Sequence, residues 1–291
     1  MAAGLLASLA SCASFPPSRP AAAPWGLLPA DSELFLFADL QATRGLLEPL
    51  AGRLLHSAPG QIGKLLERTD ELYAGLRFQP GAPPQAEAAV WGRYSPDAVG
   101  LNLDWSCGWR RNPGEPPFWS NRRLPLEVAA PERGLLLVAY GTPPDARGLL
   151  ARWRNPEPDP LVRLDLTEPA LRRELLAGSD LYAFLPVLPP ALGQAAQLPI
   201  YSLWLAARRQ GDGFTFGALA LLDREPDPDS VLRVVRLAAA ALMRRAGLAN
   251  LVERLKELEV EVSGRTVAVS GLSLSREELL RMLGARPDAA D

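Results

Sequence analysis

The hydrophobic pattern divides the first half of the chain into strands and helices. Residues 34–38 form a continuous apolar run, which predicts a buried strand. Leucines at helical spacing predict helical structure over residues 43–76, with an interruption near residues 57–60. The other elements expected in this half are strands over residues 88–94 and 99–105, a long irregular segment, and a hairpin over residues 124–140.

A helix start and a proline-rich break follow this hairpin. Thr142 is expected to cap the helix, because threonine oxygens accept from free amides and Pro143 suits the first helical position. Residues 154–160 contain alternate prolines, which exclude both a helix and the interior of a sheet. We therefore place the boundary between the two halves of the chain at residues 154–160.

The second half repeats the order of elements in the first. Residues 179–185 resemble residues 32–37, and a hairpin that turns at residues 211–213 follows. A long helix is expected to begin near residues 227–230, and a second hairpin covers residues 260–269. Ser275 and Glu278 form a capping box for a last helix, in a place equivalent to that of Thr142.

The fold class predicted is α+β, with two related halves of antiparallel strands covered by helices on one face. Duplication explains the repeated order, although an α+β chain can also produce such a repeat by chance. The expected organisation is a signal peptide at residues 1–11, a proline-rich tether at 12–24, a first half at 25–153, a linker at 154–160, a second half at 161–284 and a disordered tail at 285–291.

The N-terminus carries a short motif that ends in a cysteine. Leu9, Ala10, Ser11 and Cys12 follow an apolar run and resemble the lipobox of bacterial lipoproteins, in which the signal is cut before the cysteine and the thiol carries lipid. The resemblance implies a lipid anchor at Cys12 and a place in the bacterial cell envelope, facing the periplasm or the exterior.

The motif departs from the lipoprotein pattern in one respect, because residues 1–4 lack the positive charge that opens a secretory signal. The alternatives are a true start further upstream and a disordered N-terminus that happens to contain a cysteine. Residues 28–32, which precede the first strand, also resemble duplicated envelope proteins of unknown function.

Composition excludes several classes of function. The net charge of −2 provides no global field to attract nucleic acid, so no nucleic-acid partner is expected. His56 is the single histidine, which rules out a multi-histidine metal site within one chain. The sequence has no phosphate-binding glycine motif, no nucleophile elbow and no CxxC pair, so neither a metal nor a cofactor is predicted.

Three weaker candidates have simpler explanations. His56 could pair with Cys107, but a histidine at a helix end is favoured as an exposed cation. The glycines of residues 211–213 lie between strands, which indicates a turn rather than a phosphate site. The third candidate, an acidic cluster before the long helix, lacks the glycine and distal glutamate of an EF-hand calcium loop. Stabilisation of the helix start by acidic residues explains it instead. Its members are Asp223, Glu225, Asp227 and Asp229.

The most unusual segment, residues 104–123, combines aromatic rings with arginines. Tryptophan and arginine are enriched in interface hot spots, so the segment is a candidate surface for a protein or glycan partner. The alternative is that a long connection covers a sheet edge and buries its own rings. The candidate residues are Trp105, Trp109, Arg110, Arg111, Phe118, Trp119, Arg122 and Arg123.

These observations support three hypotheses about function. The leading one is a lipid-anchored bacterial envelope protein with a non-catalytic binding or scaffolding role. The second is an envelope hydrolase that uses carboxylates, which requires a pocket with at least two carboxylates of raised pKa. The third is a cytosolic protein whose N-terminal motif is fortuitous.

Overall fold

The computed structural model describes residues 24–55, 66–78, 81, 83–158, 178–187 and 200–282. The chain divides into two compact units, Met1–Leu164 and Asp165–Asp291, which we describe separately as unit 1 and unit 2. The predicted lipidation site Cys12, the lipobox, His56 and the C-terminal tail lie outside the described residues.

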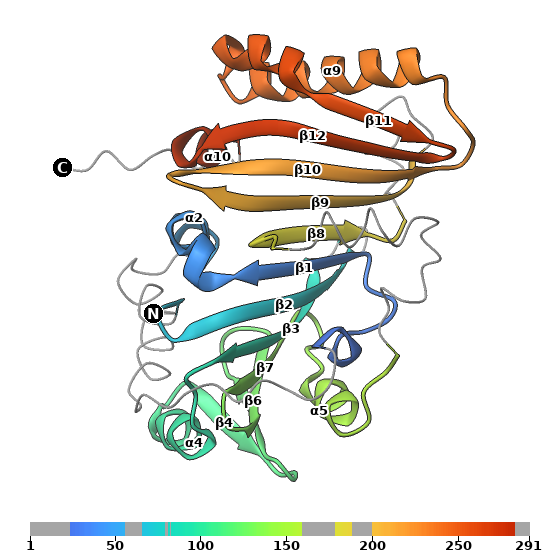
Figure 1. The fold of residues 1–291 in the computed structure, drawn as a ribbon. Coiled ribbons are helices and arrows are strands. Elements are labelled where there is room, and N and C mark those ends of the chain that lie inside the picture. The colour runs from blue at the N-terminus through green and yellow to red at the C-terminus, as the bar shows by residue number, and fades with distance from the viewer. Residues whose placement is uncertain are drawn as a thin grey trace, which may run out of the picture. The chain divides into compact units, whose positions relative to one another are not determined.

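Unit 1 contains an antiparallel sheet in which strands far apart in sequence become neighbours (Figure 1). The register places Phe35, Gly75, Glu87 and Ala139 side by side across four strands. The order across the sheet is β1 (Leu34–Asp39), β2 (Thr69–Arg77), β3 (Gln85–Gly92), β7 (Leu135–Tyr140), β6 (Leu126–Glu132), β5 (Phe118–Asn121) and β4 (Trp109–Asn112).

Helices cover both faces of this sheet. The 3₁₀ helix η1 (Pro24–Leu27) and α5 (Ala146–Arg154) pack on the face that carries Leu137. On the opposite face, α4 (Pro96–Trp105) packs against Leu136. Adjacent residues of a strand point to opposite faces, so this arrangement differs from the predicted cover on one face. A further helix, α2 (Leu40–Leu55), follows β1 and lies against β2.

The strands of unit 2 are also antiparallel. Their order is β8 (Leu181–Leu185), β9 (Ile200–Gln210), β10 (Gly213–Leu222), β12 (Thr266–Ser275) and β11 (Glu259–Ser263). The helices of unit 2 are α9 (Pro228–Arg245), the 3₁₀ helix η2 (Ala249–Glu257) and α10 (Arg276–Met282). Met243 of α9, Leu251 of η2 and Leu274 of β12 belong to one apolar cluster, which forms the core between helices and sheet.

The two units share one strand topology. The order β1-β2-β3-β7-β6 in unit 1 corresponds to β8-β9-β10-β12-β11 in unit 2. A helix follows the third strand in both units (α4 and α9), and another follows the last hairpin (α5 and α10). The β4–β5 hairpin is an addition found in unit 1. The predicted α+β class with antiparallel strands is confirmed, and the shared order supports duplication.

Two predicted elements have the wrong type. Residues 69–77, expected to be helical, form strand β2, because pairing with β1 and β3 outweighs the apolar spacing. Residues 99–105, expected to form a strand, belong to helix α4. Every second position there is apolar, yet Val99 and Leu103 are also four apart and share the buried side of α4. Leu101 and Trp105 share its exposed side.

The two predicted helix caps have different outcomes. Thr142 is not the cap of α5, because the helix begins later and Asp145 Oδ1 accepts a hydrogen bond from the Gly148 amide at 2.8 Å. The capping box of α10 is confirmed. Ser275 Oγ accepts from the Glu278 amide at 3.2 Å, and the Ser275 amide donates to Glu278 Oε2 at 2.7 Å.

Candidate functional site

The segment of residues 104–123 is a structured edge of unit 1 rather than an irregular connection. It contains the end of α4 and the β4–β5 hairpin. Trp109, Phe118 and Trp119 are buried in the two cores on either face of the sheet. Their rings therefore have a structural role and cannot contact a partner at the surface. Trp105 is the exception, with 87% of its surface exposed.

Asp104 fixes the buried and exposed parts of this edge to each other. Its Oδ1 atom accepts a hydrogen bond from Trp119 Nε1 at 2.7 Å. Its Oδ2 atom lies 3.7 Å from Arg111 Nη1, and the Arg111 guanidinium lies 5.9 Å from the centre of the Trp119 ring. Because Arg111 is largely exposed, this ion pair stabilises the fold little, but it orients the arginine.

The predicted site residues of the segment that are exposed, together with Leu101 of α4, form the set that we call the Trp105 surface. It includes Leu101, which is 58% exposed and which sequence reasoning did not single out. The signal for Leu101 was its spacing of four from Trp105, which places both side chains on one side of a helix. The surface consists of Leu101, Trp105, Arg110, Arg111, Arg122 and Arg123.

A second site in unit 1, also missed from sequence, is centred on Glu87 in the middle of β3. Its side chain is 5% exposed and lies between two guanidinium groups. Arg77 Nη2 is 2.9 Å from Glu87 Oε1, and Arg152 Nη2 of α5 contacts Oε2. Burial raises the pKa of Glu87 to about 7, although both arginines act to lower it. The only sequence signal was a glutamate within an apolar strand.

Glu87 alone does not provide a pair of catalytic carboxylates. In the described part of the chain, the side chains that contact its two oxygens are arginines rather than a second carboxylate. Both of its oxygens are paired with arginines, and Arg152 Nε also donates to the Leu27 carbonyl at 2.9 Å. The cluster thus joins η1, β2, β3 and α5, which is the arrangement of a structural ion-pair network.

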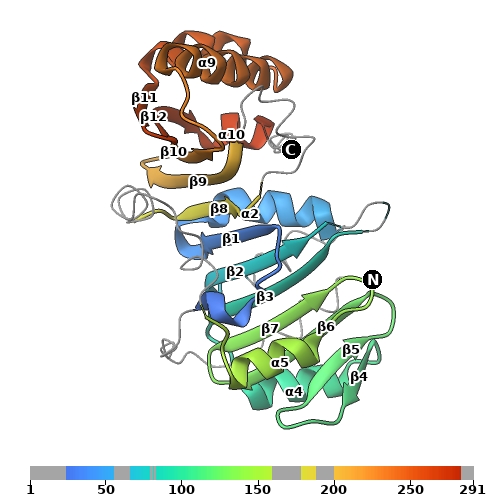
Figure 2. The ribbon, with the colours of Figure 1, turned by 90° about the vertical axis from the view of Figure 1, so that its right-hand side faces the viewer.

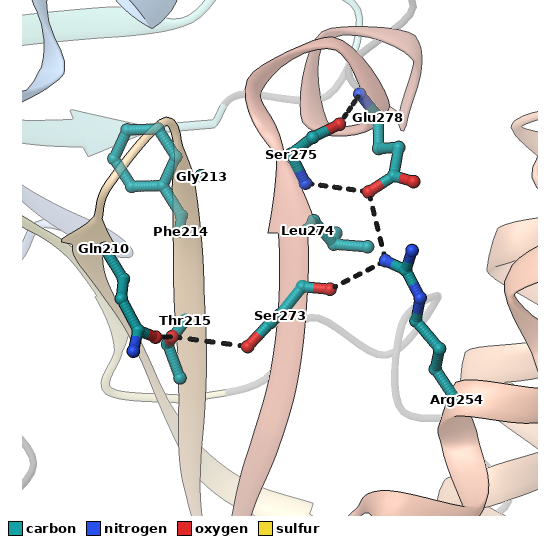
Figure 3. Close-up of a pocket in the computed structure, with 9 residues that line it drawn as sticks. All are labelled: Gln210, Gly213, Phe214, Thr215, Arg254, Ser273, Leu274, Ser275 and Glu278. Atoms are coloured by element: carbon teal, nitrogen blue, oxygen red, sulfur yellow. Dashed lines mark hydrogen bonds and ion pairs between the residues drawn. The ribbon is translucent and has the colours of Figure 1, made fainter.

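A shallow pocket of about 240 Å³ lies in unit 2, beside the start of β10 and the end of β12 (Figure 3). Its one carboxylate, Glu278, is already engaged by the Ser275 amide and lies 3.4 Å from Arg254. The Thr215 hydroxyl donates to Gln210 Oε1 at 2.6 Å. These polar groups satisfy one another, so the pocket provides neither a general acid and base nor a vacant cationic group.

The remaining sequence candidates are placed as turns and caps. The turn between β9 and β10 contains Gly211 at a φ of 60°, as predicted for a hairpin. Asp227 accepts from the Ser230 amide at 3.1 Å and from its hydroxyl at 2.5 Å, and these bonds lower its pKa. Within the described ranges, no group of three or more metal-ligating side chains is assembled. Cys107 is exposed.

These features define an α+β protein of two topologically equivalent units, one of which carries an extra edge hairpin with an exposed tryptophan. In the described part of the chain, no helix is both long and apolar enough to cross a membrane. No protein-family model matches the sequence, and neither does any curated protein.

Solved structures show the same fold at low sequence identity. Crystal form III of TP0453 matches with a TM-score of 0.63 and 14% identity, covering 90% of this chain and 98% of that one. Crystal form I has the same TM-score and identity, with 91% and 98% coverage. Crystal form IV has a TM-score of 0.60 at 14% identity, with 90% and 96% coverage. At this identity the likeness establishes the fold alone.

Proposed function

We propose that this chain is a lipid-anchored protein of the bacterial envelope that binds a partner without catalysing a reaction. The anchor rests on Leu9, Ala10, Ser11 and Cys12, which resemble a lipobox. The proline-rich residues after Cys12 favour an extended tether that rises about 3.1 Å per residue. Such a tether holds the folded units away from the membrane surface.

The exposure of Trp105 is the observation that carries the binding role. A tryptophan that is 87% exposed keeps a large apolar ring in water, and Leu101 adds to the same side of α4. Residues of this type contribute most to binding when a partner covers them. Arg111 of β4 pairs with Asp104, the residue next to Trp105, at 3.7 Å, so charged groups of both signs lie beside the exposed ring, as at the polar rim of a binding surface.

The anchor is tested by replacing the cysteine. In the native bacterium, Cys12→Ala should move the protein from the membrane fraction to the soluble envelope fraction, because the thiol that carries the lipid is gone. Cys107→Ala is the matched control, since it removes the other cysteine without touching the motif. If wild type, Cys12→Ala and the control are all found in the soluble fraction to the same extent, the anchor hypothesis is wrong.

The binding role is tested by crosslinking in intact cells. Trp105→Ala should reduce the yield of the specific crosslinked complex while the melting temperature stays unchanged. The control is Leu237→Ala, because Leu237 of α9 is also exposed, at 70%, but belongs to unit 2. If both variants give the wild-type crosslinking pattern, the Trp105 surface does not bind a partner.

A further inference from the structure

The outer edge of β4 carries backbone groups that point away from the sheet. In unit 1, β4 is the last strand in the order, and β5 is its neighbour. The Arg122 amide donates to the Gly108 carbonyl at 2.9 Å. Hydrogen-bonded pairs recur every two residues in an antiparallel ladder, so the Arg110–Ser120 pair is also bonded.

It follows that the amide and carbonyl of Arg111 face outward, together with the carbonyl of Trp109. The Trp109 amide also faces outward, but it is satisfied by the Ser106 carbonyl at 3.1 Å. Within the described ranges, no other strand pairs with this side of β4. Figure 2 shows β4 at the end of the unit 1 sheet, next to α4. Edge strands of this kind accept an extended peptide as an additional strand.

The charge around β4 selects the kind of peptide. Arg110 and Arg111 lie on neighbouring positions of the strand, so their side chains point to opposite faces of the sheet. Arg122, whose amide bonds to Gly108 just before β4, is also exposed. A strand added beside β4 therefore meets the positive charge of Arg110 on one face, whereas on the other face the charge of Arg111 is paired with that of Asp104 at 3.7 Å. Trp105, at the end of α4, provides an exposed apolar ring four positions before β4.

We propose that the partner adds to β4 as an extended peptide with acidic side chains and apolar residues between them. This inference rests on the proposed binding role. A second copy of this chain is a poorer occupant. Symmetric pairing of two β4 strands would bring Arg110 and Arg111 close to their own copies, and like charges on paired strands are destabilising.

The test measures binding of a fluorescein-labelled peptide of alternating valine and glutamate to the full chain by fluorescence anisotropy. Arg111→Ala removes one charge, whereas Arg111→Pro also removes the outward amide without breaking the ladder to β5. The proposal predicts that Arg111→Pro binds the peptide about tenfold more weakly than Arg111→Ala, since one additional hydrogen bond is lost. Arg276→Ala, an exposed position in unit 2, should bind like wild type.

A second probe keeps the test decisive if Arg111→Pro does not fold. The same peptide, N-methylated at every residue, loses the amides that pair with β4 from either of its edges and should not bind wild-type protein. Equal binding of the methylated and unmethylated peptides would overturn strand addition. Two other results would also overturn it. One is a concentration-dependent dimer that Arg111→Ala strengthens, and the other is binding to phosphatidylglycerol vesicles in place of the peptide.

The outcomes also separate this inference from the proposed function. If the peptide fails to bind while Trp105→Ala still removes a crosslinked complex in cells, the binding role stands and strand addition is wrong. If neither experiment detects a complex, both proposals fail.

Discussion

The ion pairs around Glu87 lead to a specific prediction about stability and pH. Glu87 is 5% exposed, and burial raises its pKa from 4.5 to about 7. A carboxyl group with a raised pKa in the folded state binds its proton more tightly when folded than when unfolded. Its contribution to stability is therefore complete below about pH 4.5 and is lost as the pH rises through about 7.

The shift from 4.5 to about 7 corresponds to about 3 kcal/mol in the free energy of unfolding. Glu87→Gln removes the titration and keeps the shape of the side chain. Wild-type protein should thus lose about 3 kcal/mol relative to Glu87→Gln between about pH 4.5 and about pH 8.5. Urea unfolding curves at intervals across this range measure the difference.

The control for this experiment is Glu132→Gln, because Glu132 is an exposed carboxylate at the end of β6. The difference between wild type and this control should not change with pH. A wild-type stability that rises relative to Glu87→Gln as the pH increases would show that Arg77 and Arg152 dominate over burial. A constant difference would show that Glu87 does not titrate in this range, and either result refutes the reasoning.

Three further predictions concern stability. Trp119→Ala should lower the free energy of unfolding in urea by about 3–5 kcal/mol, because a buried ring and its bond to Asp104 are lost. Trp105→Ala, at an exposed ring, should lower it by less than about 0.5 kcal/mol. Similar losses for the two variants would contradict the difference in burial. Gly92→Ala should lower the melting temperature, since its Cβ would meet the Arg68 carbonyl oxygen, and an unchanged melt would show that β2 and β3 can move apart there. Ser275→Ala should cost about 1 kcal/mol by loss of the α10 cap, and no change in thermal unfolding would argue against that cap.

Local patterns in the sequence determined the features that depend on nearby residues. The capping box of Ser275 and Glu278 needs only residues three apart, so it was predicted correctly. The turn at residues 211–213 was predicted because glycine permits the positive φ that the hairpin requires. The hairpins and the α+β class likewise followed from periodicity along the chain, but the element types of residues 69–77 and 99–105 did not.

Tertiary structure decided the features that depend on residues far apart. Residues 99–105 fit both a strand and a helix by spacing, and packing of Val99 and Leu103 on the sheet selected the helix. Packing of α4 on the sheet also leaves Trp105 exposed and Trp119 buried, although the sequence placed both in one candidate segment. Arg152 is 65 residues from Glu87 in sequence, so their ion pair exists only because α5 packs over β3 and β7. No local pattern encodes that contact, because burial and partner both come from the assembled sheet.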